Sequence, residues 1–194
     1  AEHNCISDVF FGTDYHSHLG TRRGGMVLFD KKEGFQRQIH NIENTPFRTK
    51  FERDLADFRG HAGLGCISDS DPQPLLVRSH LGLYAIVTVG IINNTDELVK
   101  AYLSDKGQQF LTLSSGRVNV TELTAALINQ ENDLVSGILH AQRVIEGSMT
   151  ILILTEEGEL IAARDSMGRL PVLIGQREDG YCVSFESFAY HKLD

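Results

Sequence analysis

Residues 146–155 read EGSMTILILT, residues 158–175 read GELIAARDSMGRLPVLIG, and residues 182–189 read CVSFESFA. Aliphatic and β-branched residues dominate these stretches, which predicts four strands in quick succession at 150–154, 160–164, 172–174 and 182–185. Glu157-Gly158 and Asp179-Gly180 fall between strands and are typical of hairpin turns. The last quarter of the chain is therefore predicted to be antiparallel β-structure.

Outward from this stretch, the predicted strands and helices come in groups. We expect helices at 8–18, 47–58, 96–103 and 121–144, the last broken near Asn132, and further strands at 26–30, 35–40, 63–67, 75–78 and 84–89. The helix at 47–58 is predicted from apolar residues at helical spacing, namely Phe47, Phe51, Leu55 and Phe58. This grouping favours an α+β fold, with antiparallel sheets stacked face to face and helices outside, over an alternating βαβ fold.

Length, charge and cysteine usage exclude several classes of protein. The 194 residues suit one domain with its own core, and a net charge of −8 argues against a nucleic-acid or anionic-membrane surface. No apolar run approaches the roughly 20 residues of a membrane span, and the first residues lack the features of a signal peptide. Cys5, Cys66 and Cys182 form no CxxC pair, which argues against a disulfide framework or a zinc site. We therefore expect a cytoplasmic protein that binds no metal, cofactor, nucleic acid or membrane.

The opening stretch resembles the end of the class-II glutamine amidotransferase domain of amidophosphoribosyltransferases. In that family an "EGAYS" strand is followed by "ARDPxGxRPLxxG" and then by "ASES". The chain matches this pattern in order and spacing at Arg164-Asp165, Gly168, Pro171 and Glu186-Ser187. The match is specific because it ties a strand pair, a tight turn and a return strand together.

Earlier segments follow the same family order. The family's "HRGQ…AGI", "GIGHxRY…AQP", "HNGNLTNxxEL" and "SDTE" have counterparts at residues 18–26, 63–74, 89–98 and 119–122. The resemblance implies an N-terminal-nucleophile hydrolase fold, a four-layer αββα sandwich, over residues 1–194. It also implies a place in purine biosynthesis and a C-terminal phosphoribosyltransferase-like domain as partner, which would begin near Asp194. A homo-oligomer is left open.

The catalytic cysteine of the family has no clear counterpart. It is the free N-terminal residue and lies about two dozen residues before the histidine of "HRG", whereas Cys5 lies thirteen residues before His18. Cys5 would need proteolytic exposure to act as the nucleophile, and otherwise reads as a small apolar residue near a helix start. Cys66 takes the place of the family's histidine in "GHxRY", and we interpret it as a core residue.

One of the two hydrogen-bond donors of the family's oxyanion hole has a counterpart in this chain. Gly90 matches the glycine whose backbone N–H donates to the oxyanion, whereas Val89 replaces the asparagine that supplies the second donor. Two interpretations stay open for Gly90: a remaining oxyanion donor, or simply the turn that follows a buried strand. Asn94, in a turn pair with Asn93, is a candidate to reach a ligand through its side-chain amide.

Both charge partners of glutamine differ from the family pattern. Ser68 stands where an arginine binds the substrate carboxylate, and Asp69 beside it would repel that carboxylate. Val120 stands where an aspartate binds the substrate ammonium. Thr121 and Glu122, which follow it, are candidate ligand contacts or simply helix-capping residues.

Three hypotheses follow. The chain is the glutaminase domain of an amidophosphoribosyltransferase-like protein with impaired or lost hydrolysis of glutamine. Alternatively, it is a non-catalytic regulatory, ligand-binding or domain-docking module, whose altered pocket holds glutamine or another small polar molecule on Ser68, Asp69, Asn94, Thr121 and Glu122. In the third, cleavage before Cys5 or Ser7 activates a hydrolase of another specificity.

Overall fold

The first sheet has the strand order β2-β1-β3, and all its pairings are antiparallel. Its strands are β1 (Arg23–Asp30), β2 (Gly34–Asn41) and β3 (Ala62–Ser68). The computed structural model describes residues 3–105, 108–111, 113–114 and 116–190. Six consecutive residues of β1 are buried, because one of its faces packs on helices and the other on the second sheet.

The second sheet has the order β4-β5-β8-β9 and is also antiparallel. Its strands are β4 (Leu75–Ser79), β5 (Gly82–Ile92), β8 (Gly147–Thr155) and β9 (Leu160–Ala163). The predicted turn at Gly158 joins β8 to β9, with a positive φ of 86° at the glycine. The stretch EGSMTILILT therefore forms a strand buried on both faces, which explains its nearly continuous apolar run.

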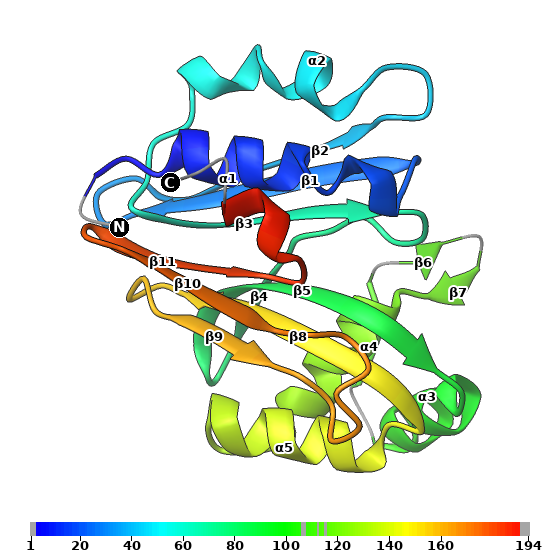
Figure 1. Cartoon of the computed structure of the whole chain (residues 1–194). Helices are drawn as coiled ribbons and strands as arrows, with labels where there is room; N and C mark the ends of the chain where they lie inside the picture. The colour runs from blue at the N-terminus through cyan, green and yellow to red at the C-terminus, as the bar shows by residue number, and fades with distance from the viewer. Residues whose placement is uncertain (1–2, 106–107, 112, 115, 191–194) are drawn as a thin grey trace.

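The two sheets face each other with helices on both outer sides (Figure 1). Helices α1 (Ile6–Asp14) and α2 (Phe47–Phe51) cover the first sheet, while α4 (Val120–Ile128) and α5 (Leu134–Val144) cover the second. Between the sheets lies a cluster of buried residues from both: Val27, Phe29, Leu64, Cys66, Ala85, Val87, Leu152 and Leu154. The predicted stacking of antiparallel sheets with helices outside is thus what the structure has.

The remaining elements lie at the margins of these layers. Helix α3 (Thr95–Ser104) follows β5, and the strands β6 (Leu113–Ser114) and β7 (Arg117–Val118) form a short hairpin before α4. Strands β10 (Leu173–Arg177) and β11 (Gly180–Ser184) pair only with each other among the described strands. Arg177 of this hairpin donates to Asp8 of α1, which fastens the carboxyl-terminal hairpin to the first helix.

Two helix predictions were wrong in extent. The helix expected at 47–58 ends at Phe51 and is followed by a short 3-10 turn (Asp54–Ala56). Phe58 is nevertheless buried in the same cluster as Phe47 and Phe51, so the apolar spacing indicates burial here and not an unbroken helix. The helix expected at 8–18 ends at Asp14, and a 3-10 turn (Ser17–Leu19) follows it.

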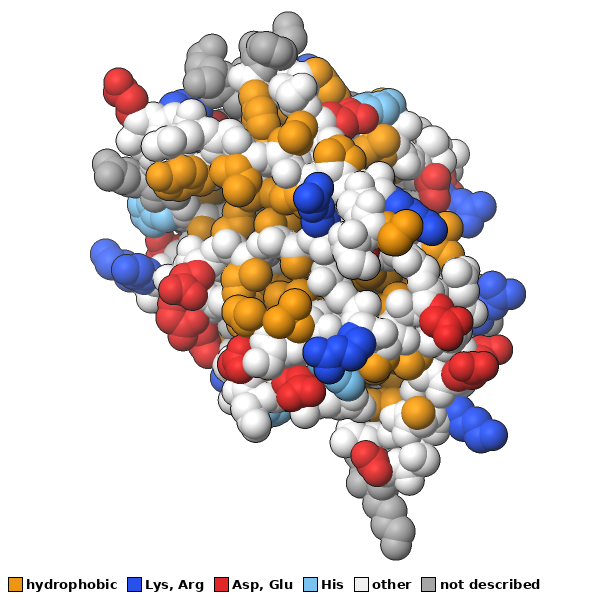
Figure 2. All heavy atoms as spheres, turned by 60° about the horizontal axis from the view of Figure 1, so that its bottom comes forward, with side chains coloured by type: hydrophobic (Ala, Val, Ile, Leu, Met, Phe, Trp, Pro, Cys, Tyr) orange, Lys and Arg blue, Asp and Glu red, His pale blue; other side chains and the backbone are white. Residues whose placement is uncertain are grey.

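The outer surface of the second helical layer is partly apolar. Val135 and Leu139, four residues apart on α5, are 61 % and 56 % exposed. Figure 2 brings the lower side of Figure 1 forward and shows hydrophobic side chains at the surface between charged ones. In the described part of the chain, no helix combines the length and the apolar composition required to cross a membrane.

Candidate functional site

A cavity of about 380 Å³ lies where the ends of β3 and β5 meet the start of α4. Its lining comes from the segment after β3, from the end of β5 and from the first turn of α4: Leu19, Cys66, Ile67, Ser68, Asp69, Ser70, Asp71, Gln73, Thr88, Val89, Gly90, Ile91, Ile92, Val120 and Thr121. The fold thus brings together Gly90, Ser68, Asp69 and Thr121, which are far apart in the sequence. Its volume lies within the range of pockets that bind small molecules.

The backbone of Gly90 is directed to the open side of β5. In the antiparallel ladder with β8, Glu156 donates to the carbonyl of Leu83, and Asn93 donates to the carbonyl of Glu146. Because pairing alternates along such a ladder, odd-numbered residues of β5 bond to β8 and even-numbered ones turn to the other side. There β4 pairs only as far as Ile86. The N–H of Gly90 therefore points to an edge that no described strand covers, beside the cavity.

Gln73 takes the place of a strand at this edge. Its side-chain amide donates to the carbonyl of Thr88 (3.0 Å) and accepts from the N–H of Thr88 (2.7 Å). Gly25 of β1 makes room for this segment, because a Cβ atom at that position would lie 1.7 Å from the carbonyl oxygen of Gln73. The conformation of β5 next to Gly90 therefore depends on a buried glutamine and on a glycine from the other sheet.

The charged groups that line the cavity are carboxylates. Asp71 is only 6 % exposed and accepts a hydrogen bond from the N–H of Val120 at 2.9 Å. Asp69 accepts from the backbone N–H groups of Thr21 (2.6 Å) and Arg22 (3.2 Å), and these hydrogen bonds lower the pKa of its carboxyl. Among the described residues, the lining includes no lysine, arginine or histidine. The cavity therefore favours neutral or cationic groups over anionic ones.

Sequence reasoning missed Asp71. It lies three residues after Ser68 in the run SDSDPQP, where a carboxylate reads as part of a solvated loop. In the fold it does not lie in a solvated loop. Its carboxylate contacts the first turn of α4 at Val120, where the family pattern has an aspartate. The only signal in the sequence is an acidic residue directly before a proline, which is too common to indicate a site.

Thr121 lines the cavity and is fully buried. Its hydroxyl pairs with that of Thr88 at 2.7 Å, which ties α4 to β5. The cap of α4 is Asn119, whose side chain accepts from the N–H groups of Thr121 and Glu122. The carboxylate of Glu122 accepts from the N–H of Leu111 at 2.7 Å, and Glu122 does not line the cavity.

Asn94 also lies away from the cavity. Its side chain donates to the carbonyl of Val144 and accepts from the N–H of Glu146, both at 3.0 Å. These bonds join the start of α3 to the connection between α5 and β8. Asn94 therefore has a structural role that accounts for its side-chain amide.

The two cysteines singled out by the sequence lie in different layers. Cys5 is buried between α1 and the first sheet, away from the cavity, and burial raises the pKa of its thiol to about 11. Its N–H donates to the carbonyl of Gly60 at 2.8 Å. Cys66 does line the cavity, but burial raises the pKa of its thiol to about 12. Both thiols are therefore neutral at physiological pH and are poor nucleophiles.

No metal centre is apparent in the described ranges. Nowhere in them do three or more histidine, cysteine, aspartate or glutamate side chains gather in a way that could hold a metal ion. The two histidines closest in sequence, His16 and His18, contact Ser184 and Glu186 instead. The side chains that line the cavity at Gly90 can offer hydrogen bonds and electrostatic contacts to a ligand.

Comparison with known proteins places this geometry in a family. The profile of the "Glutamine amidotransferase domain" family matches residues 62–190. Amidophosphoribosyltransferases are similar along the chain: that of Methanocaldococcus jannaschii is 27 % identical over 98 % of this chain, and that of Bacillus subtilis is 28 % identical over 94 %. The chain covers 41 % and 38 % of these two proteins, and so spans about two fifths of their length.

Solved structures agree. The glutamine phosphoribosylpyrophosphate amidotransferase of B. subtilis, complexed with ADP and GMP, matches 97 % of this chain with a TM-score of 0.83 and 27 % identity. A structure described as the allosteric regulatory enzyme of purine biosynthesis matches 97 % of the chain with a TM-score of 0.81 and 26 % identity. In each case the chain covers 41 % of the solved chain, and the expected mixed α+β, N-terminal-nucleophile type of fold is confirmed. The chain belongs to the glutamine amidotransferase domain family, in the class-II branch represented by amidophosphoribosyltransferases.

Proposed function

We propose that this chain is the glutamine amidotransferase domain of an amidophosphoribosyltransferase-like protein, and that it keeps the ligand cavity but has lost glutamine hydrolysis. The observation that carries the proposal is the charge of the cavity lining, which holds Asp69 and Asp71 and, among the described residues, no basic side chain. The α-carboxylate of glutamine needs a cation, and the family pattern places Ser68 where that cation would be.

The electrostatic cost is large enough to matter. A ligand carboxylate placed at Ser68 would lie beside the carboxylate of Asp69, and like charges repel. Each 1.4 kcal/mol of repulsion weakens binding about tenfold. The absent arginine adds the loss of a bidentate charge-assisted contact.

The catalytic groups support the same proposal. The N–H of Gly90 remains as one oxyanion donor, but Val89 offers no second donor, and loss of one donor costs about a hundred- to a thousandfold in rate. Cys66, the cysteine in the cavity lining, is buried, and burial raises the pKa of its thiol to about 12, so the reactive thiolate is scarce at neutral pH. Neither group compensates for the other.

A non-catalytic ligand-binding or regulatory role is the second candidate, and the position of Asp71 favours it. Its carboxylate meets the N–H of Val120, where the family pattern has the aspartate that binds an ammonium. A carboxylate supplied from the segment after β3 would thus take over that contact. The ligand expected in such a cavity is a small neutral or cationic polar molecule without a carboxylate.

The rest of the protein is proposed from the relatives. Because the chain spans about two fifths of each relative's length, we propose that residues 1–194 form one domain that works with a C-terminal phosphoribosyltransferase-like domain in the cytoplasm. A hydrolase activated by cleavage before Cys5 or Ser7 is not favoured, because Cys5 is buried and its N–H is bonded to Gly60. Intact-mass measurement of active protein tests that alternative directly.

Ammonia release from glutamine tests the main proposal. We expect no release above background and no glutamine-induced rise in Tm, and release by the wild-type chain above background would contradict the proposal, whether or not it persists in Cys5→Ala. The double variant Ser68→Arg/Val120→Asp should gain stabilisation by glutamine, because it restores both charge partners. The matched control, Ser104→Arg/Val135→Asp, adds the same charges at an exposed helix end and an exposed face of α5 and should gain none.

A further inference from the structure

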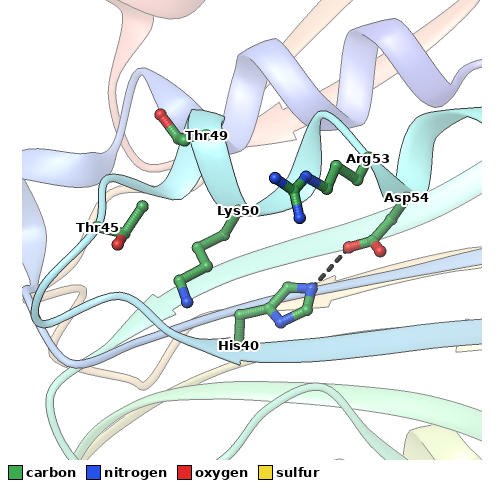
Figure 3. A pocket seen from close by; sticks show the side chains of 6 residues that line it. All are labelled: His40, Thr45, Thr49, Lys50, Arg53 and Asp54. Carbon is green, nitrogen blue, oxygen red and sulfur yellow. Dashed lines mark hydrogen bonds and ion pairs between the residues drawn. The ribbon is translucent and has the colours of Figure 1, made fainter.

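A second hollow lies on the opposite side of the molecule from α4 and α5, between α2 and the end of β2. It has a volume of about 390 Å³ and is lined by His40, Thr45, Thr49, Lys50, Arg53 and Asp54. Figure 3 shows the head groups of Lys50 and Arg53 on the same side as the ring of His40. None of these residues belongs to the cavity at Gly90 or to the family motifs described above.

The two cations have no carboxylate partner. Within the described residues, neither the Lys50 ammonium nor the Arg53 guanidinium makes a side-chain hydrogen bond or an ion pair. Arg48, on the same helix, pairs with Asp14, and Arg177 pairs with Asp8 and Asp179.

Their spacing makes the arrangement unfavourable without an anion. Lys50 and Arg53 are three residues apart at the end of α2, where Glu52 and Arg53 still have αR dihedral angles. Side chains at this spacing are neighbours, and like charges there destabilise a helix. An anion between the two head groups would convert this repulsion into attraction.

The other lining residues suit an anion as well. Thr45 and Thr49 bring hydroxyl groups that can donate hydrogen bonds. Asp54, the only acidic residue in the described lining, is paired with Nε2 of His40 at 2.6 Å, which occupies one of its carboxylate oxygens. The His40 ring is held edge-on against Phe51, with 4.7 Å between ring centroids, so this side of the hollow is fixed in place.

We propose that this hollow binds the phosphate group of a small phosphorylated molecule. A phosphate carries up to two negative charges and several acceptor oxygens, which match one lysine, one arginine and two hydroxyl groups better than a singly charged carboxylate does. The hollow is larger than a bare phosphate needs, and the aliphatic parts of Lys50, Arg53 and the threonines offer contact to the organic part of the ligand.

Calorimetric titration with inorganic phosphate and with phenyl phosphate tests this proposal. The wild-type chain should bind both saturably, phenyl phosphate more tightly, whereas acetate and chloride at matched ionic strength should give no saturable signal. Lys50→Ala/Arg53→Ala should weaken phosphate binding by about tenfold or more, because removal of a charged donor costs about 1.5–3 kcal/mol. Lys50→Arg/Arg53→Lys should retain binding within a few-fold.

The matched control is Lys31→Ala/Lys32→Ala, which removes the same charge from the turn at the other end of β2, about 25 Å away along the strand. It should bind phosphate like the wild type, and both double variants should keep the wild-type Tm. Absence of saturable phosphate binding by the wild type would overturn the proposal. So would equal loss of affinity in both double alanine variants, because binding would then follow net charge and not this hollow.

Discussion

Replacing Gln73 with methionine should destabilise the fold far more than its position in a connecting segment suggests. Gln73 is 5 % exposed, and its amide group bonds to both the N–H and the carbonyl of Thr88, which is also 5 % exposed. Methionine keeps most of the side-chain volume, so Gln73→Met leaves little cavity and isolates the hydrogen-bonding loss. The variant leaves two buried backbone groups of β5 without a partner.

The magnitude follows from those two groups. A buried donor or acceptor left unsatisfied costs about 1–3 kcal/mol, so the two groups together cost about 2–6 kcal/mol. Domains of this size unfold with about 5–15 kcal/mol, and the loss is therefore a large fraction of the total. Gln73→Glu can still accept from the N–H of Thr88 but donates to its carbonyl only when protonated, so its stability relative to wild type should recover as the pH falls.

Urea unfolding at neutral pH measures the effect, with the free energy of unfolding compared at constant m-value. Gln38→Met on β2 is the matched control, because that glutamine is exposed and its replacement should change stability by no more than about 0.5 kcal/mol. If Gln73→Met unfolds within about 0.5 kcal/mol of the wild type, Gln73 does not hold β5 in place beside Gly90, and the reasoning fails.

The remaining predictions concern single groups. Gly25→Ala places a Cβ atom 1.7 Å from the backbone oxygen of Gln73, so it should yield insoluble protein or a sharply lowered Tm, and wild-type stability would contradict the packing described. Cys66 should react with a thiol reagent only after unfolding, because its pKa is raised to about 12, and rapid labelling of native protein at pH 8 would refute this. Hydrogen bonds from backbone N–H groups hold the pKa of Asp69 below its ordinary value of 3.8. The ionised carboxylate therefore stabilises the fold above pH 3.8, and this stabilisation is lost as the pH falls through the lowered pKa. Asp69→Asn should therefore lower Tm at neutral pH and converge with the wild type in acid, as melting at both pH values would show. Asn119→Ala removes the cap of α4 and should cost about 1 kcal/mol in urea unfolding, whereas an unchanged midpoint would mean that the cap contributes nothing.

Sequence patterns predicted the strands and turns whose conformation depends on residues close together in the chain. The apolar run at 146–155 predicted β8, because a strand buried on both faces restricts the residue type along its length. Gly158, which has a positive φ, and Asp179-Gly180 predicted the two hairpin turns. The motif from Arg164 to Ser187 identified the family because it spans several strands and turns in a fixed order. The stacking of the sheets followed from the order of these elements.

Other features depended on contacts between distant segments. Asn94 and Glu122 were candidates for a ligand contact, and the structure places them outside the cavity lining, where they bond to Val144 and Leu111, contacts that no local pattern indicates. Asp71 was overlooked because its role arises only when the segment after β3 folds against the first turn of α4.

The sequence by itself determined the helices and strands, their order and the family. This is possible because backbone conformation and burial restrict the residue type at regular positions along the chain. The tertiary structure alone decided which charged groups face each cavity. The sequence does not show whether a charged side chain contacts an opposite charge, a backbone N–H or a cavity. The packing of distant segments decides which of these contacts it makes. That is why Asp69 and Asp71 meet at one cavity while Lys50 and Arg53 meet at another.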